Sequence, residues 1–376
     1  MRLAVNTRLL LRDKLEGIGW FAHETLSRIT RAHPEHEFLF LFDRPFDPRF
    51  IYAPNVRPIV AGPPTRHPLL YRLWFEYQVP RLLRKHKADA FLSPDGFLTT
   101  RTRVPQLAVI HDLNFEHHPK DLPGAYARYY RTWFPRFARQ AARIATVSEY
   151  SRQDIVRCYQ VDPGRIDVVH NGVGEVFSPL SEQQQRAVRT RLTGGAPYFI
   201  CVGSLHPRKN IARLITAFDR FAEQVPDVRL VVVGEAFWWD ARMKAAHRTM
   251  RHADRLNFTG RLGQEALRDA LASALALAYV SYFEGFGIPV VEAMRCGTPV
   301  LAANATSLPE VAGDAALYCD PFNVDRITEA LLALHGDVAL RERLHHAGIQ
   351  RAAQFSWDHT AAGLWASVER MMARQS

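Results

Sequence analysis

The stretch that decides the fold is residues 276–303, ALAYVSYFEGFGIPVVEAMRCGTPVLAA. Its first five residues are apolar enough for a buried strand, and a second such run occupies residues 300–303. Between the two runs, Pro289 presets φ for a first helical turn, and the segment Cys296-Gly297-Thr298-Pro299 ends the helix. The stretch therefore predicts a strand, a short buried helix and a second strand.

Two glutamates bracket the predicted helix start. Gly285 and Gly287 let the backbone adopt positive φ or approach a ligand closely, so we expect the helix to begin near Ile288. Glu284 then precedes the helix, and Glu292 lies about one turn inside it. The amides at such a helix start favour a phosphate, and the carboxylates can accept hydrogen bonds from hydroxyls on its two sides. In a plainer interpretation, Glu284 is solvated and Glu292 is a capping or surface residue.

A second loop with ligand-binding chemistry lies at residues 203–210. It follows the predicted strand 198–202 and precedes apolar residues at helical spacing over 211–218. Ligands of open parallel sheets lie beyond the carboxyl ends of strands, which places Arg208 and Lys209 where they can hold a diphosphate. Arginine grips two phosphate oxygens as a fork, and lysine adds a compact charge. An Arg-Lys pair in a loop can also be simply solvated.

Strand-like and helix-like segments alternate along the chain, which predicts parallel sheets covered by helices. The segment 171–179 is rich in turn formers and separates two sets of strands, so we expect two α/β domains with a cleft between them. Residues 357–372 form an amphipathic pattern that predicts a final helix packing back on the domains. The expected strands are 3–5, 38–42, 107–110, 143–147, 166–169, 198–202, 230–233, 256–258, 276–280 and 300–303.

Composition indicates a globular protein of ordinary type. The chain has 376 residues, of which 47% are hydrophobic and 23% charged. The longest uncharged apolar stretch, 271–283, is too short to span a bilayer, and the N-terminus lacks a signal-peptide pattern, so we expect a cytoplasmic protein. The cysteines are scattered without a Cys-x-x-Cys motif, which argues against a zinc site or a disulfide framework and predicts reduced core residues: Cys158, Cys201, Cys296 and Cys319.

The positive charge is concentrated in the N-terminal half. The formal net charge is +10, and residues 1–175 hold 26 Lys and Arg against 18 Asp and Glu. Such a field favours anionic partners, namely nucleic acid, an acidic membrane surface or a phosphorylated acceptor. The basic, aromatic stretches 71–85 and 126–143 could lie on an anionic membrane at its inner face. They could equally be helices that pack their aromatic side chains inward and keep their arginines in water.

The Glu-x7-Glu window and the run Pro207-Arg208-Lys209-Asn210 together resemble the retaining glycosyltransferases of the GT4 family, which have the GT-B fold. The resemblance covers nearly the whole chain, since its motifs occur in family order from Gly17 to Glu310. It implies an α/β fold of two Rossmann-like parallel-sheet domains facing a central cleft. Residues 1–172 would form the acceptor-side domain, 173–355 the nucleotide-sugar-binding domain, and 356–376 the C-terminal helix.

The resemblance also implies roles for individual residues. Arg208 and Lys209 would hold the diphosphate, while Glu284 would bind sugar hydroxyls and Glu292 the ribose hydroxyls. His111, after the strand 107–110, would lie near the transferred sugar. Gly19 would contact the donor phosphates from the turn Gly17-Ile18-Gly19, which we expect to precede a helix over residues 20–29. The other donor-binding residues implied are Gly234, Arg261, Leu262, Gly285, Phe286 and Gly287. Many relatives carry an arginine directly after the first glycine of the 203–210 loop, where this chain has Ser204, and Arg208 would supply that charge.

The reaction implied is transfer of a hexose, mannose among the candidates, from a nucleoside-diphosphate sugar to a saccharide or lipid-linked acceptor in cell-surface polysaccharide synthesis. The family implies no bound metal and no cofactor beyond the donor co-substrate. Two other functions stay open. A nucleotide-sugar epimerase or phosphorylase would keep the fold, whereas a basic nucleic-acid-binding protein would leave the glycine-flanked glutamates unexplained, so no nucleic-acid partner is expected.

Overall fold

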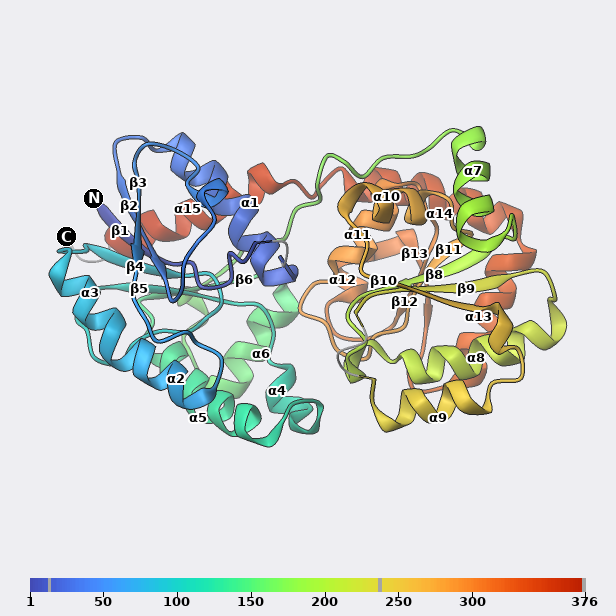
Figure 1. Cartoon of the computed structure of the whole chain (residues 1–376), viewed down its shortest axis with the longest axis horizontal. Helices are drawn as coiled ribbons and strands as arrows, with labels where there is room; N and C mark the ends of the chain where they lie inside the picture. The colour runs from blue at the N-terminus through green and yellow to red at the C-terminus, as the bar shows by residue number, and fades with distance from the viewer. Residues whose placement is uncertain (13–14, 236–238, 374–376) are drawn as a thin grey trace. The chain divides into compact units, whose positions relative to one another are not determined.

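The computed structural model describes residues 1–12, 15–235 and 239–373 (Figure 1). They form two compact units with separate hydrophobic cores. Of the described residues, those within 1–172 and 357–373 form the first unit, and those within 173–356 form the second. The division after Gly172 lies in the turn-rich segment, and Ser356 belongs to the second unit, where it forms a β-bridge with Val173.

The sheet of the first unit has seven parallel strands in the order β3-β2-β1-β4-β5-β6-β7. The sequence did not reveal β3, because Arg57 and Pro58 interrupt its apolar pattern, which an edge strand tolerates. It also did not reveal β4. The strands are β1 Arg2–Asn6, β2 Glu37–Phe42, β3 Val56–Val60, β4 Ala90–Ser93, β5 Gln106–Ile110, β6 Arg143–Thr146 and β7 Ile166–Val168.

Helices cover both faces of this sheet. In Figure 1, α1 and α15 lie on one face, and α2, α3 and α5 lie on the other. The apolar residues of α15 are buried as the amphipathic pattern predicts, and Trp365 stacks on His33 with 3.9 Å between ring centroids. The helices are α1 Gly17–Ala32, α2 Pro68–Leu73, a π-helical turn Trp74–Gln78, α3 Val79–Lys85, α4 Asn114–His117, α5 Gly124–Gln140, α6 Glu149–Tyr159 and α15 Trp357–Ala373.

The sheet of the second unit has six parallel strands in the order β10-β9-β8-β11-β12-β13. Residues 276–303 form the predicted unit of strand, helix and strand, with α11 beginning at Ile288. The edge strand β13 was not predicted. The strands are β8 Tyr198–Val202, β9 Arg229–Val233, β10 Leu256–Gly260, β11 Ala276–Tyr279, β12 Val300–Ala303 and β13 Ala316–Cys319.

Helices also cover both faces of the second sheet. Figure 1 shows α8, α9 and α13 together on one face and α10, α11 and α14 on the other. Among the described helices of the chain, none is long and apolar enough to cross a membrane. The helices are α7 Glu182–Thr193, α8 Ile211–Gln224, α9 Ala241–Thr249, α10 Gln264–Ala272, α11 Ile288–Arg295, α12 Leu308–Ala312, α13 Val324–Gly336 and α14 Val338–Ala352.

Candidate active site

The loops after β8, β9, β10 and β11 leave the same edge of the second sheet, because these strands are parallel and adjacent. Gly234, directly after β9, passes very close to the loop after β8. A Cβ atom added to Gly234 would lie 1.9 Å from the carbonyl oxygen of Gly203. The N–H of Gly234 donates to the carbonyl oxygen of Gly260 at 3.0 Å. Gly234 therefore joins three neighbouring loops at a point where no side chain fits.

Arg208, Lys209 and Glu284 meet at this edge. Arg208 Nη1 donates to Glu284 Oε2 at 2.9 Å, and Lys209 Nζ donates to Glu284 Oε1 at 2.6 Å. The hydroxyl of Tyr279 accepts from Lys209 Nζ at 2.6 Å and donates to Glu284 Oε1 at 3.0 Å. The structure thus brings together three residues that the sequence assigned to one ligand, although they come from two loops about 75 residues apart.

Burial strengthens the interactions between the charges of this cluster. Glu284 is 4% exposed and Lys209 is 8% exposed. Burial alone would raise the pKa of Glu284, but the positive charges of Arg208 and Lys209 lower it to about 2. Burial lowers the pKa of Lys209, and the carboxylate of Glu284 opposes that shift. With all three groups ionised, the cluster has one net positive charge and suits an anionic ligand.

We predict that Glu284→Gln destabilises the second unit by about 3–5 kcal/mol, because it leaves Lys209 buried without its counterion. Urea unfolding of the ligand-free protein measures this loss. The folded pKa of Glu284 is about 2 and its ordinary value is 4.5, so the stabilisation is complete above pH 4.5 and is lost as the pH falls toward 2.

Glu329→Gln is the matched control for this prediction. Glu329 pairs with Arg326 on the surface, where both side chains are more than half exposed, so its loss should cost less than about 1 kcal/mol. Equal unfolding free energies for the two variants would contradict a stabilising role for the buried ion pairs of Glu284.

Backbone contacts hold Glu284 and the Arg208-Lys209 loop in place. The N–H of Glu284 donates to Thr306 Oγ1 at 3.1 Å, and Ser307 Oγ donates to the Glu284 carbonyl oxygen at 2.9 Å. Asn210, with φ +61°, donates from Nδ2 to the carbonyl oxygens of Val280 and Pro321. These bonds connect the loops after β8, β11, β12 and β13, so the positions of the charges follow from the packing of the whole sheet edge.

Glu292 contrasts with Glu284. It lies in the second turn of α11, as predicted, and is partly exposed. Among the described residues its carboxylate has no hydrogen-bond or ion-pair partner, and burial raises its pKa to about 8. A carboxylate that is partly buried and lacks a hydrogen-bond partner is stabilised by a ligand that donates hydrogen bonds to it.

The glycine-flanked loop between the glutamates has a packing role. Gly287 has φ +101°, and a Cβ atom there would lie 2.7 Å from Leu308 Cδ2, so both its conformation and its surroundings require glycine. Gly285 does not adopt positive φ. The ring of Phe286 is 3% exposed and packs edge to face on Phe355. Ligand contacts of the buried residues 285–287 are therefore expected from the backbone alone.

The N-terminal residues implied by the resemblance lie in the first unit. His111 follows β5, and its Nε2 donates to the Pro94 carbonyl oxygen at 2.8 Å. This bond leaves Nδ1 as the acceptor of the neutral ring, and burial lowers the pKa of His111. The carboxylate of Asp112 accepts from the N–H of Asn114 at 3.0 Å, and the Pro94 carbonyl oxygen helps to orient the His111 ring.

Gly19 is in a helix and not in the loop that the Gly17-Ile18-Gly19 pattern suggested. Helix α1 begins at Gly17, and neither glycine has positive φ. Gly19 is buried, and a Cβ atom there would lie 3.1 Å from the Leu9 carbonyl oxygen. Glycine is thus needed here for close packing of the helix on the chain that precedes it.

The remaining residues implied in donor binding lie after β10. Arg261 is exposed and Leu262 is half-buried, and both follow the Gly260 carbonyl that Gly234 contacts. They are therefore on the same sheet edge as Arg208 and Glu284. Tyr279, which completes the charged cluster, was not predicted from the sequence. The feature of the sequence that could have pointed to Tyr279 is a hydroxyl on the last residue of an otherwise apolar, buried strand.

Two family models match the chain in succession. The model of Glycosyltransferase Family 4 matches residues 16–175, and the model of Glycosyl transferases group 1 matches residues 182–351. The alpha-maltose-1-phosphate synthase of Mycobacterium tuberculosis is 31% identical over 279 residues, which cover 69% of this chain and 71% of that relative. The chain belongs to the GT4-type glycosyltransferases. The predicted family and the predicted glycosyltransferase class are thereby confirmed.

One further relative and two solved structures are also similar to the chain. An O-antigen chain mannosyltransferase B of Escherichia coli is 29% identical over 365 residues, covering 93% of this glycosyltransferase and 94% of that relative. The sucrose-phosphate synthase of Thermosynechococcus elongatus superposes with a TM-score of 0.78 at 18% identity, covering 100% of both chains. HepE of Anabaena in complex with UDP-glucose gives 0.76 at 17% identity, covering 98% of this chain and 100% of that one. These neighbours confirm the predicted GT-B fold.

Proposed function

We propose that this glycosyltransferase transfers a hexose, with retention of anomeric configuration, from a nucleoside-diphosphate sugar to a saccharide or lipid-linked acceptor in cell-surface polysaccharide synthesis. The observation that carries the proposal is the buried cluster of Arg208, Lys209 and Glu284, which presents net positive charge at the carboxyl edge of a parallel sheet. Mannose is the first hexose to test, because relatives such as the E. coli O-antigen protein are mannosyltransferases.

In the proposed reaction, the bond between sugar C1 and the diphosphate oxygen breaks, and the acceptor oxygen bonds to C1 on the same face. The acceptor proton passes to the departing phosphate oxygen. Negative charge grows on the diphosphate as the first bond breaks, and Arg208 and Lys209 are the groups that would stabilise it. The amide groups at the start of α11 would add to this field. These charges take the place of a metal ion in the proposal.

The two glutamates have different proposed roles. Glu284 holds Arg208 and Lys209 in position and offers its remaining lone pairs to sugar hydroxyls, since its oxygens already accept three hydrogen bonds. Glu292, which has no partner among the described residues, accepts hydrogen bonds from the ribose hydroxyls. The contact of His111 with the transferred sugar stays a prediction of the family resemblance.

We predict that Lys209→Met lowers kcat by about 10²–10³, the loss typical of removing one group that stabilises developing negative charge. Release of nucleoside diphosphate and formation of glycosylated acceptor are measured together. Lys244→Met is the matched control, because Lys244 is exposed on α9 and makes no contact with the cluster. Unchanged turnover in Lys209→Met would sink the proposal.

The nucleotide and the reaction class are open to direct measurement. Thermal-shift assays with UDP, GDP, ADP and dTDP identify the base by the ligand that stabilises the protein most. Incubation of donor with and without acceptor then distinguishes transfer from the alternatives. An epimerase would convert the donor sugar without acceptor, and a phosphorylase would require inorganic phosphate.

We predict opposite effects of Glu292→Gln on stability and on donor binding. Because burial raises the folded pKa of Glu292 to about 8, the folded protein keeps this carboxyl protonated where the unfolded chain ionises it, so stability falls as the pH rises from 4.5 to 8. The variant should therefore melt at a higher temperature than wild type, with a difference that grows over this range. Donor affinity should fall by about tenfold or more, because a charge-assisted hydrogen bond contributes about 1.5–3 kcal/mol. A lower melting temperature at pH 8 would contradict the assignment.

The first unit has a surface that fits the proposed lipid-linked acceptor, which we call the basic apolar face. Leu69, Leu73 and Tyr77 lie four residues apart on α2 and the π-helical turn and are 59%, 41% and 49% exposed. Residues 61–88 contain one carboxylate, Glu76, which is buried and accepts from Thr100. The exposed cations of this segment form no ion pair among the described residues: Arg66, Arg72, Arg81, Arg84, Lys85 and Lys87.

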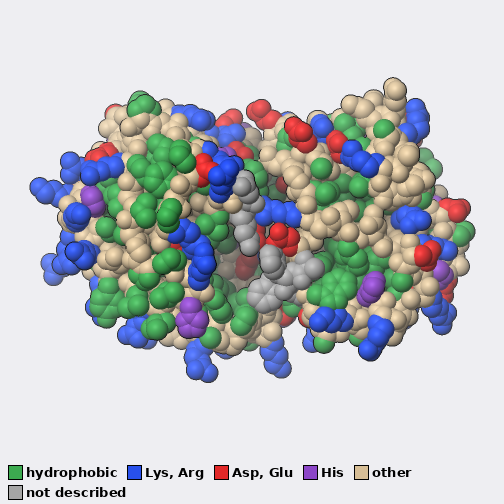
Figure 2. Space-filling view, viewed as in Figure 1, with side chains coloured by type: hydrophobic (Ala, Val, Ile, Leu, Met, Phe, Trp, Pro, Cys, Tyr) green, Lys and Arg blue, Asp and Glu red, His purple; other side chains and the backbone are tan. Residues whose placement is uncertain are grey.

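Neighbouring side chains extend this face. Arg101 lies over the ring of Tyr77 at 4.3 Å, and Arg72 and Arg136 approach the ring of Trp133 on α5. Figure 2 shows hydrophobic side chains beside Lys and Arg side chains over much of the visible surface of the first unit, with few acidic ones. Exposed apolar side chains framed by unpaired cations suit an anionic membrane surface, where both lipid tails and headgroups are recognised.

We predict that the protein binds vesicles containing phosphatidylglycerol and not vesicles of phosphatidylcholine alone. Arg81→Glu with Arg84→Glu should weaken binding about tenfold or more, at roughly 1 kcal/mol per cation, and Leu69→Asn with Leu73→Asn should also weaken it. Val338→Asn is the matched control, since Val338 is 56% exposed on the second unit. Co-sedimentation measures binding, and equal binding by all variants would contradict the proposed face.

A further inference from the structure

Three potential metal ligands converge in the first unit, apart from the proposed donor site. His117 is the last residue of α4, and Asp154 and Cys158 lie one turn apart on α6. His117 Nε2 is 2.9 Å from each oxygen of Asp154. The Sγ atom of Cys158 is 3.6 Å from Asp154 Oδ1 and 3.9 Å from His117 Nε2. These atoms all lie within 4.8 Å of one another.

The separations are those of three corners of a zinc tetrahedron. Nitrogen, oxygen and sulfur ligands lie about 2.0–2.3 Å from zinc, so adjacent ligand atoms lie roughly 3.3–3.7 Å apart. The distances involving Cys158 fall within a few tenths of an ångström of this range, and the His117–Asp154 distance must open by a similar amount.

The chemistry of the set also favours zinc over harder cations. A thiolate and a carboxylate together neutralise a divalent ion, and an imidazole with a thiolate prefers zinc to magnesium or calcium. Asp154 is 2% exposed, so its position is set by packing, whereas the side chain of His117 is 31% exposed and can adjust. Arg157 competes for Asp154 at 2.5 Å, but its side chain is 66% exposed and can withdraw into water.

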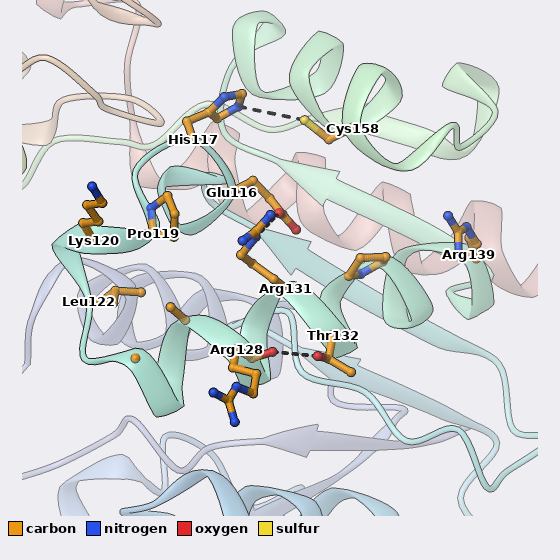
Figure 3. Close-up of a pocket in the computed structure, with 13 residues that line it drawn as sticks. Glu116, His117, Pro119, Lys120, Leu122, Arg128, Arg131, Thr132, Arg139 and Cys158 are labelled. Carbon is orange, nitrogen blue, oxygen red and sulfur yellow. Dashed lines mark hydrogen bonds and ion pairs between the residues drawn. The ribbon is translucent and has the colours of Figure 1, made fainter.

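A fourth ligand could reach such an ion from solvent. His117 and Cys158 line a pocket of about 880 Å³ between α4, α5 and α6. Figure 3 shows their side chains pointing toward one another at its wall, with Lys120, Arg131 and Arg139 also lining the pocket. Three protein ligands with an open position is the arrangement of zinc sites that bind water or an exogenous ligand.

We propose that His117, Asp154 and Cys158 form a zinc-binding site at the wall of this pocket. The ion replaces the hydrogen bonds of the three side chains with bonds that join α4 to α6. The site does not depend on the proposed transfer reaction and takes no part in it. The sequence argued against a zinc site because the chain has no Cys-x-x-Cys motif. The proposed site needs no such motif, since it uses one cysteine and a histidine 37 residues before the aspartate.

The test is Co²⁺ binding by the full chain after treatment with EDTA. One Co²⁺ per chain should give the visible bands of four-coordinate cobalt and a sulfur-to-cobalt charge-transfer band, and Zn²⁺ should displace both. Cys158→Ser should abolish the charge-transfer band, and Asp154→Asn or His117→Gln should weaken binding by more than about tenfold. Cys319→Ser, which alters a buried thiol in the second unit, should leave the spectrum unchanged.

A variant that should bind Co²⁺ more tightly is a useful control, because misfolding can explain a loss of affinity but not a gain. Arg157→Gln removes the competing cation from Asp154 and should tighten Co²⁺ binding several-fold, with the same spectrum. Zn²⁺ should raise the melting temperature of the wild type and of Arg157→Gln more than that of Cys158→Ser. The proposal is overturned if stoichiometric Co²⁺ gives no charge-transfer band, if the band survives in Cys158→Ser, or if Arg157→Gln has no effect on affinity.

Discussion

The buried ion pair of Lys209 and Glu284 is the interaction on which the candidate active site depends. Neither charge is stable at its position alone, because burial lowers the pKa of Lys209 and would raise that of Glu284. The pair forms because β8 and β11 are neighbours in the sheet, which places the loops that follow them side by side. Arg208 and Tyr279 complete the pairing, and the backbone contacts of Thr306, Ser307 and Asn210 keep the loops from separating.

Glutamate has opposite properties at two positions eight residues apart, at the two ends of one nine-residue window. Glu284 is surrounded by cations and has a pKa of about 2, whereas Glu292 has no partner among the described residues and has a pKa of about 8. Glu284 therefore has its hydrogen-bond and charge partners without a ligand, whereas Glu292 would gain a hydrogen-bond partner only when a ligand binds. This difference supports a division in which Glu284 organises charge and Glu292 selects a hydroxyl-bearing ligand.

Much of the architecture was predictable because buried parallel strands require continuous apolar runs. The strands β2, β8, β9, β11 and β12 met that requirement and were found within a residue or two. The edge strand β3 was not found, because it contains Arg57 and Pro58, which an edge strand tolerates. The edge strand β13 was not found either. Gly19 was misplaced into a loop, since a glycine that permits close helix packing has the same local signature as one that permits a turn.

By itself, the sequence determined the family, the two-unit α/β organisation and the residue types of the candidate active site, because these depend on local periodicity and short motifs. Tertiary structure alone decided how those residues are used. It paired Glu284 with Lys209 and Arg208, added Tyr279, left Glu292 unpartnered, and brought His117 to Asp154 and Cys158. The physical reason is that charge state and ligand geometry depend on burial and on neighbours distant in sequence, and only the folded chain supplies both.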